Sequence, residues 1–342
     1  ADASKTYLPI TGLPEYNAAV GQLVLGAGHP ALAAGRVQTA QTPGGTGALR
    51  VAADFIKRIS TGTPAIWVSD ETWANHPGIF QAAGLDVRQY PYYNPRTFSL
   101  QLDRMLEAIG RIPRGDTILL HGVCHNPTGL DPAPEQWVRI ADAVGRQGLL
   151  PLIDFAYQGL GDGLEEDAAG ARLFAAPGRQ SLIASSFSKN FSLYNERVGA
   201  LIVIGATPEN AEKALSHVAP AIRTNYSNPP RQGAALVSVV LADPELRRAW
   251  VEEVAVMRGR INQMRARFVE GLKAKGVDRD FSFITRQKGM FSYSGLTPDQ
   301  VAALREKYAI YIVNSGRINV AGMTPGNMDR LCGAIAEVLQ GA

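Results

Sequence analysis

Short apolar runs alternate with amphipathic stretches from about residue 40 to residue 205. The runs at 65–69, 117–123, 149–153, 181–187 and 200–204 are nearly continuous in apolar and β-branched residues. Such runs are typical of strands that are buried on both faces of a sheet. We therefore expect five buried strands in this part of the chain.

The stretches between these runs have the apolar spacing of helices. Residues 46–59 place Leu49, Ala53 and Ile56 on one face, and residues 134–146 gather their apolar positions in the same way after prolines at the entry. Alternation of strand and helix predicts an α/β fold with a mainly parallel sheet covered by helices.

The pattern changes after about residue 230. A long helical region at 244–268 is followed by short segments at 281–284, 289–293 and 310–313, by a helix at 298–307 and by a last helix from Pro325. We expect a large domain over residues 1–255 and a small α+β domain over residues 256–342.

Composition and charge exclude several classes of protein. The chain has 342 residues, with 34 Lys+Arg against 31 Asp+Glu and a net charge of +3. This balance, without any basic run, does not indicate nucleic-acid binding. Cys124 and Cys332 form no disulfide framework, and no apolar stretch reaches the roughly 18 residues of a membrane span. We expect a cytoplasmic protein that binds neither nucleic acid nor a membrane.

Ligands of open α/β sheets bind beyond the carboxyl ends of the strands. In this chain those ends carry Trp73 and the residues 121–126, 154–157 and 186–189. These are the most chemically reactive segments of the sequence. We expect them to gather at one edge of the sheet.

The segment TPGGTGALR, residues 42–50, places a glycine-rich turn before a helix. The backbone N–H groups and the dipole of a helix N-terminus favour an anion, and Thr46 could add a hydroxyl donor. An ordinary glycine turn explains the segment equally well. The segment has neither the Lys-Ser/Thr ending of a P-loop nor the spacing of a dinucleotide fingerprint.

Two further segments place polar groups after buried runs. In LLPLIDFAYQG, Asp154 is either a turn carboxylate or the counter-ion of a buried cation such as a protonated pyridine nitrogen, and Tyr157 could donate its phenolic proton nearby. In HGVCHNPTG, the histidines and the cysteine suggest zinc, but no other Cys/His pair has ligand spacing, so we expect no metal. An Asn-Pro turn there would leave the amide of Asn126 free for a ligand.

Lys189 lies in SSFSKNFSLYNERVG, directly after a predicted strand. A lysine kept partly out of water has a lowered pKa, and its neutral amine forms Schiff bases with carbonyls. Pyridoxal phosphate requires this chemistry. Ser186, Ser188 and Arg197 supply donors suited to a phosphate.

Together these segments resemble the class I aminotransferases of fold type I, in the aspartate and aromatic amino acid branch. SSFSKNFSLYNERVGAL resembles the family's lysine motif, and seven further segments match in the same order: TPGGTGAL, ETWANH, HNPTG, DFAYQG, YSNPP, GMFSYSGL and SGRINVAG. The resemblance covers essentially all of the chain. It implies a pyridoxal-phosphate enzyme with a large and a small domain, built as a homodimer with shared active sites.

The resemblance also implies a role for each matching residue. Lys189 would carry the cofactor and move the substrate proton, and Asp154 would pair with the pyridinium nitrogen with His76 behind it. Asn126 and Tyr157 would hydrogen-bond the phenolic oxygen of the cofactor ring.

The other implied contacts involve the phosphate, the ring face and the substrate. Trp73 would stack on the ring, and Trp73 and Asn126 would also contact the substrate. Arg317 would bind the substrate α-carboxylate in a bidentate fork. The phosphate would be held by Gly45, Thr46, Ser186 and Arg197.

Three residues would come from the partner subunit. Tyr7 and Ser227 would reach the cofactor, and Arg223 would meet the side-chain carboxylate of a dicarboxylic substrate. Members of the family also carry several dozen residues before the segment that matches YLPITGL, namely an arm that crosses to the other subunit and a stretch that closes over the substrate. The sequence here begins just before that segment.

The resemblance leaves the substrate open between two branches. YLPITGL, WVSDETWANH, YPYY and GMFSYSGL are similar to the aromatic branch, whereas TPGGTGAL and Asn195 are similar to the aspartate branch. We expect ping-pong transfer of the amino group of tyrosine, phenylalanine and aspartate to 2-oxoglutarate, with a dedicated aspartate aminotransferase as the alternative. A non-catalytic cofactor-binding module would need an attached DNA-binding segment, and a lyase or decarboxylase would not need both Arg317 and Arg223.

Overall fold

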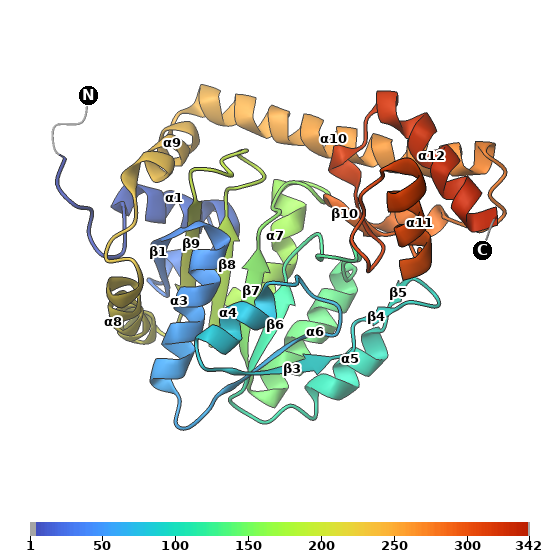
Figure 1. The fold of residues 1–342 in the computed structure, drawn as a ribbon. Helices are drawn as coiled ribbons and strands as arrows, with labels where there is room; N and C mark the ends of the chain where they lie inside the picture. The colour runs from blue at the N-terminus through green and yellow to red at the C-terminus, as the bar shows by residue number, and fades with distance from the viewer. Residues whose placement is uncertain (1–4, 341–342) are drawn as a thin grey trace.

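A seven-stranded sheet forms the centre of the larger part of the protein (Figure 1). The computed structural model describes residues 5–340. In spatial order the strands are β1 (Val37–Pro43), β9 (Val198–Ile204), β8 (Ser181–Ser186), β7 (Leu150–Phe155), β6 (Thr117–His121), β2 (Ala65–Ser69) and β3 (Asp86–Tyr90). The strands from β8 to β3 are parallel, while β9 is antiparallel to both β8 and β1. The predicted mainly parallel sheet is confirmed.

The five predicted strands are present, and two strands at the edges of the sheet were missed. In β3 most side chains are exposed or half-buried, and β1 is rich in polar residues such as Gln38, Thr39 and Gln41. An edge strand pairs on one side only and therefore does not need the continuous apolar run on which the prediction depended.

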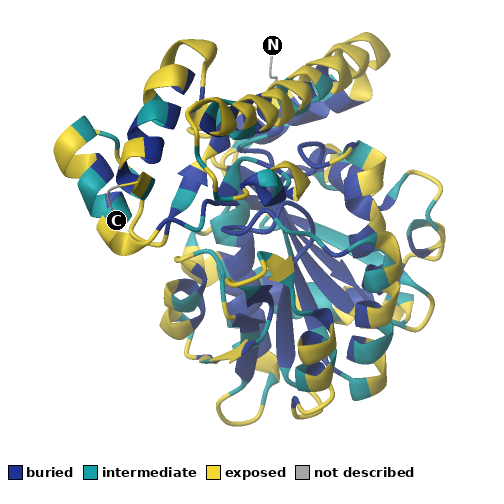
Figure 2. Ribbon diagram, turned by 90° about the vertical axis from the view of Figure 1, so that its right-hand side faces the viewer, coloured by how far each residue is buried: buried dark blue, intermediate teal, exposed yellow. Residues whose placement is uncertain are grey.

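Two apolar cores cover the two faces of the sheet, and side chains alternate between them along each strand. In β8, Ile183 joins one core, while Leu182 and Ala184 join the other. This alternation explains the nearly continuous apolar runs, because both faces of each central strand are buried. Figure 2 shows the strands as buried and the outer faces of the surrounding helices as exposed.

Helices form a layer on each face of the sheet. Helix α3 (Gly44–Ile59) packs on β9 and β8, with α4 (His76–Ala82) and α8 (Pro208–Asn225) beside it. The other helices of the larger part are α1 (Pro14–Leu25), α2 (Pro30–Ala33), α5 (Leu102–Ile109), α6 (Pro134–Gln147), α7 (Leu164–Arg172) and α9 (Arg231–Ala242), with a 3-10 turn η1 (Leu173–Ala175) and a short pair β4 (Tyr93–Asn94) and β5 (Ser99–Leu100). No helix within residues 5–340 is long and apolar enough to span a membrane.

Helix α10 (Pro244–Ala274) connects the larger part with a smaller one (Figure 1). Its residues Trp250 and Val254 belong to a core of the sheet region, whereas Ile261 and Phe268 belong to a separate core. That second core is built with η2 (Ser282–Arg286), β10 (Phe291–Tyr293), α11 (Pro298–Tyr308), β11 (Arg317–Asn319), η3 (Val320–Gly322) and α12 (Pro325–Gln340).

The three short segments noted at 281–284, 289–293 and 310–313 take different forms in the structure, a 3-10 helix, a strand and an irregular segment. Residues 310–313 form no strand, and the strand that pairs with β10 is β11, where Tyr293 is opposite Arg317. Ile310 and Ile312 instead pack against the core of this part as partly buried side chains. Their apolar character therefore reflects packing without strand pairing.

Candidate active site

Three neighbouring parallel strands bring the predicted site residues to one end of the sheet, where the carboxyl ends of the strands lie. His121 of β6 is opposite Asp154 of β7, and Asp154 is opposite Ala184 of β8. The carboxyl ends of these strands are thus level. Asn126 follows β6 in a turn with a cis Asn126–Pro127 bond, and Lys189 follows β8 by three residues.

Lys189 lies at the centre of this end of the sheet. Its Nζ lies 4.5 Å from the centre of the Tyr157 ring. Burial lowers the pKa of Lys189, the Asp154 carboxylate opposes this shift, and the Arg197 charge adds to it. The next residue, Asn190, is buried and fixed: its amide donates to Gln158 O at 3.1 Å, and its carbonyl accepts from Trp250 at 2.8 Å. The backbone beside the lysine is therefore held firmly.

Asp154 is paired with His76, which begins helix α4. The Nε2 of His76 lies 3.0 Å from Oδ2 of Asp154. Burial alone would raise the pKa of Asp154, but the hydrogen bond from His76 and the nearby positive charge of Lys189 lower it below its ordinary value. The carboxylate is thus kept ionised although it is buried.

A directed chain of hydrogen bonds reaches this carboxylate from Asn126. The backbone N–H of Asn126 donates to Nδ1 of His121 at 3.3 Å, so the proton of this neutral ring lies on Nε2. That nitrogen lies 3.1 Å from Oγ1 of Thr72, which lies 2.8 Å from Nδ1 of His76. The network assigns His121 as donor to Thr72 and Thr72 as donor to His76. Burial lowers the pKa of His121 to about 3, which agrees with a neutral ring.

Asn126, Tyr157 and Arg317 form a second connected group. The amide of Asn126 donates to the hydroxyl of Tyr157 at 3.3 Å, and its oxygen accepts from Nη1 of Arg317 at 3.3 Å. The Arg317 guanidinium also lies over the ring of Phe291, 4.5 Å from its centre. Burial raises the pKa of Tyr157, which keeps its hydroxyl protonated. Below, Lys189, Asp154, His76, Asn126 and Tyr157 are called the strand-end cluster.

The predicted phosphate-binding residues meet beside the cluster. A Cβ on Gly44 would lie 2.5 Å from the Arg197 guanidinium, and Gly44 has a φ of 77°, so only glycine fits there. A Cβ on Gly45 would lie 3.1 Å from Cβ of Ser186. Thr46 is in the first turn of α3, whose N–H groups have no helical partner. The helix N-terminus, the end of β8 and one arginine thus converge.

Trp73 lies against His76 of the cluster, whereas the three residues expected from a partner subunit lie on the surface. Trp73 is half-buried, with its ring edge-on to His76 at 5.3 Å between centres. Arg223 and Ser227 lie on the surface, where Nη1 of Arg223 donates to Oγ of Ser227 at 2.6 Å. Tyr7 is 91% exposed. Below, Tyr7, Arg223 and Ser227 are called the surface trio.

Residues 1–335 match the family model described as aminotransferase class I and II. The chain belongs to this family. The predicted family and fold class are confirmed.

Similar proteins of this aminotransferase family fall in both predicted branches. The chain is 51% identical to the aspartate aminotransferase of Escherichia coli over 338 residues, which are 99% of this chain and 85% of the relative. It is 48% identical to the aromatic-amino-acid aminotransferase of Pseudomonas aeruginosa over 337 residues, 98% of this chain and 84% of that one. The solved aromatic-amino-acid aminotransferase from Burkholderia pseudomallei, covalently bound to pyridoxal phosphate, has a TM-score of 0.96 and 49% identity, covering 98% of this chain and 84% of that chain.

Sequence reasoning missed some residues around the site of this aminotransferase. Thr72 joins two histidines, and the signal was its position four residues before His76, on the segment that leads into α4. His125, considered for zinc, bonds to Oγ of Ser69 at 3.0 Å and stacks on Tyr92. Within residues 5–340, no three His, Cys, Asp or Glu side chains are grouped as metal ligands.

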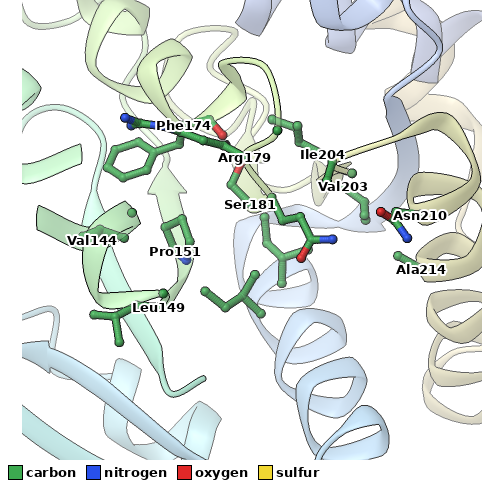
Figure 3. Close-up of a pocket in the computed structure, with 18 of the residues that line it drawn as sticks. Val144, Leu149, Pro151, Phe174, Arg179, Ser181, Val203, Ile204, Asn210 and Ala214 are labelled. Carbon is green, nitrogen blue, oxygen red and sulfur yellow. Dashed lines mark hydrogen bonds between the residues drawn. The ribbon is translucent and has the colours of Figure 1, made fainter. Parts of the chain in front are cut away.

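A cleft of about 990 Å³ lies at the opposite end of the sheet, at the amino ends of β7 and β8 (Figure 3). Its lining includes Pro151, Ser181 and Val203, and none of the strand-end cluster. The buried hydroxyl of Ser181 already donates to Phe174 O, and Arg179 is paired with Asp142 at 2.7 Å. Its volume alone does not make it the active site, because the reactive groups lie at the other end.

Proposed function

We propose that the protein is a pyridoxal-phosphate-dependent aminotransferase that moves an amino group from an L-amino acid to a 2-oxo acid. The observation that carries this proposal is the position of Lys189, which has a lowered pKa, faces Tyr157 and lies beside the ionised Asp154. A neutral amine is the form that attacks a carbonyl carbon.

The residues at this end of the sheet fit the whole of pyridoxal phosphate. The glycine turn before α3, with Thr46, Ser186 and Arg197, suits the phosphate because it offers backbone donors, hydroxyls and a cation that a side chain at Gly44 would displace. Asp154 suits a protonated pyridine nitrogen. Asn126 and Tyr157 suit the phenolic oxygen, and Trp73 the ring face. When bound, the cofactor supplies an electron sink for the negative charge that develops at the substrate α-carbon.

The chain's own residues then have separable tasks. Lys189 would hold the cofactor until the amine of the substrate displaces it, and its freed, neutral amine would then take the proton from the substrate α-carbon and deliver it to the cofactor carbon at which Lys189 had been attached. Asp154, oriented by His76, keeps a proton on the ring nitrogen. Arg317 binds the α-carboxylate, and Asn126 orients Arg317 through the hydrogen bond between them.

We propose tyrosine, phenylalanine and aspartate as amino donors and 2-oxoglutarate as acceptor, in a ping-pong cycle. Relatives named for aromatic and for aspartate transfer both support this breadth. A dedicated aspartate aminotransferase is the second candidate, favoured by the 51% identity with the Escherichia coli aspartate enzyme. The ratio of kcat/KM for phenylalanine and aspartate decides between them, and a ratio that strongly favours aspartate would overturn the first.

We further propose a cytoplasmic homodimer in which the surface trio completes the site of the neighbouring subunit. Exposure of Tyr7 and of the Arg223–Ser227 pair supports this role, because a partner can reach them. We propose residues 255/256, inside α10, as the boundary between the two domains, which is supported by the packing of Trp250 and Val254 on one core and of Ile261 on the other.

The experiment that tests the function follows product formation by the wild-type protein with bound cofactor. Purified protein is mixed with phenylalanine or aspartate and 2-oxoglutarate, and glutamate and the new 2-oxo acid are quantified together with carbon dioxide. Equal amounts of glutamate and 2-oxo acid are expected, without carbon dioxide when phenylalanine is the donor. Carbon dioxide release from phenylalanine would instead indicate a decarboxylase, whereas oxaloacetate formed from aspartate loses carbon dioxide by itself, and bound cofactor without turnover of either donor would indicate a binding module.

A further inference from the structure

Arg265 is the largest side chain in the fully buried interior, at 2% exposure. It extends from the half of α10 that packs on the smaller core. Its Nη2 donates to Phe291 O at 2.9 Å and to Oγ of Ser292 at 3.2 Å. Its Nε and Nη1 have no hydrogen-bond partner within the described residues. A buried guanidinium with two unpaired N–H donors lowers the stability of the fold unless ordered water binds to them.

A second buried side chain with idle polar atoms lies in the same region. Gln287 is 2% exposed, and neither atom of its amide has a partner within residues 5–340. A Cβ on Gly129 would lie 2.9 Å from Cβ of Gln287 and 2.7 Å from Phe291 O. The turn after β6 therefore packs directly on the segment before β10, and Lys288 N donates to Gly129 O at 2.6 Å.

The turn after β6 also contains a half-buried carboxylate, that of Asp131. Asp131 accepts from the backbone N–H of Cys124 at 2.7 Å and of His125 at 2.9 Å, which are the two residues before Asn126. Burial lowers the pKa of Arg265 to about 10, and the charge of Asp131 acts in the opposite direction. The carboxylate that shapes the Asn126 turn thus favours the charged form of Arg265.

Two segments that interact with Arg265 also contact Arg317, namely β10 and the turn after β6. Phe291, whose carbonyl Arg265 holds, places its ring under the Arg317 guanidinium. Asn126, whose turn Asp131 holds, accepts a hydrogen bond from Arg317. Arg265 therefore hydrogen-bonds to the strand that carries one support of Arg317, and it interacts electrostatically with the turn that carries the other.

We infer that Arg265 is a positioning residue for Arg317, and that its idle nitrogens, with the amide of Gln287, hold ordered water that joins β10 to the Asp131 turn. This inference rests on the proposed function only in naming Arg317 as the carboxylate site. Ordered water suits the junction, because each water can accept from Arg265 and donate to a carboxylate or an amide oxygen.

The test compares Arg265→Met, Arg265→Lys and Arg267→Met in the full-length protein with bound cofactor. Methionine keeps an apolar chain of similar reach and removes the charge. Arg267 lies two residues away on the same helix and is exposed, so Arg267→Met is the matched control. The readouts are KM and kcat for phenylalanine, the Kd of 3-phenylpropionate by calorimetry, cofactor absorbance and Tm.

Loss of charge-assisted hydrogen bonds to Arg265 is expected to raise both KM and the Kd of 3-phenylpropionate about tenfold in Arg265→Met, with a smaller change in kcat and with the cofactor retained. Arg265→Lys should recover part of the loss, and Arg267→Met should match the wild type. A lower Tm with unchanged KM and Kd would overturn the inference, because it would leave a purely structural role. If Arg265→Met does not fold, Arg265→Lys decides: a KM and Kd equal to those of the wild type would refute it.

The calorimetric measurement separates this inference from the proposed function. 3-Phenylpropionate has a carboxylate and no amine, so its binding needs no turnover. Wild-type protein that binds it without transaminating would refute the proposed function. The ratio of the Arg265→Met and wild-type Kd values would still test the role of Arg265.

Discussion

The strand-end cluster and the surface trio differ in how completely one chain builds them. Lys189, Asp154 and their neighbours are buried or half-buried, and each polar group of Asp154, His76 and Asn126 described above has a partner from another element. Among the side chains of residues 5–340, Arg223 and Ser227 have hydrogen-bond partners only in their own short segment, residues 223–228, and Tyr7 is almost fully exposed. One group is preorganised by the fold, and the other lies exposed on the surface.

This difference assigns different parts of the chemistry to the two groups. A preorganised set of donors and charges stabilises a developing charge without reorganising during the reaction. Exposed side chains cannot do this until a partner surface covers them and removes water. We therefore expect the common chemistry of transamination to depend on the cluster, and the choice of a dicarboxylic substrate to depend on the trio.

Lys189→Ala should have the largest effect of any single substitution in the cluster. Turnover should fall by at least about 10³-fold, because both the covalent hold on the cofactor and the proton transfer are lost. Steady-state rates and the cofactor absorbance after gel filtration check this. Lys213→Ala, which changes an exposed lysine of α8, is the control. More than a tenth of wild-type turnover in Lys189→Ala would contradict the assignment.

Asp154→Ala should follow, with a loss in kcat of about 10²-fold or more, because the ring nitrogen would no longer stay protonated. Part of the cofactor should remain bound, since the phosphate contacts are unchanged. Asp142→Ala removes a half-exposed carboxylate that pairs with Arg179 beside the opposite cleft, and should leave kcat unchanged. A normal rate in Asp154→Ala would mean that this carboxylate is only structural.

The cluster was largely predictable from the sequence for a physical reason. Strands that are buried on both faces can be recognised in the sequence as apolar runs. The residues after such runs lie together at the carboxyl ends of the strands of a parallel sheet. Asp154 and Lys189 could therefore be placed near each other before any distance was known. The lysine motif then supplied the chemistry.

Other features could not be predicted, because they depend on packing between distant segments. Thr72 links His76 to His121 only because β2 and β6 are neighbours. Arg265 is one arginine among several in α10, and nothing in its spacing distinguishes it from the exposed Arg267. The edge strands β1 and β3 could not be predicted for a different reason. Each pairs with a neighbour on one side only, so neither needs a continuous apolar run.

The surface trio can be tested by mixing two defective chains. Arg223→Ala should lower kcat/KM for aspartate by about 10-fold to 100-fold with little change for phenylalanine, because a charged hydrogen bond to the second carboxylate is lost. In a dimer of one Lys189→Ala and one Arg223→Ala chain, one of the two sites would be native. Co-expression of the two chains should then restore about a quarter of the wild-type activity toward aspartate, if chains pair at random. Activity no higher than in the separate variants would show that Arg223 serves its own subunit.

The charge balance at Lys189 gives a smaller and graded effect. A lysine with a lowered pKa is neutral over more of the pH range, so cofactor attachment to the apoprotein should rise with pH and level off below the ordinary lysine value of about 10.4. Asp154 opposes that lowering and Arg197 adds to it. Asp154→Asn should therefore move the midpoint to lower pH. Stopped-flow attachment rates between pH 6 and about 10 measure it, and a midpoint moved upward would refute the sign.

The smallest effect is expected from Thr72→Val, beside the cluster, which removes the hydroxyl between His76 and His121. Without it Nδ1 of His76 loses its donor, and the ring is no longer fixed in the tautomer that donates Nε2–H to Asp154. One ordinary hydrogen bond contributes about 1 kcal/mol, so kcat should fall by about five-fold, and Thr72→Ser should restore it. The loss should be equal for phenylalanine and aspartate, because the hydrogen-bond chain acts on the cofactor and not on the substrate side chain. A loss for aspartate alone would place Thr72 with the surface trio in function, and would break the division between a preorganised chemical centre and a selective surface.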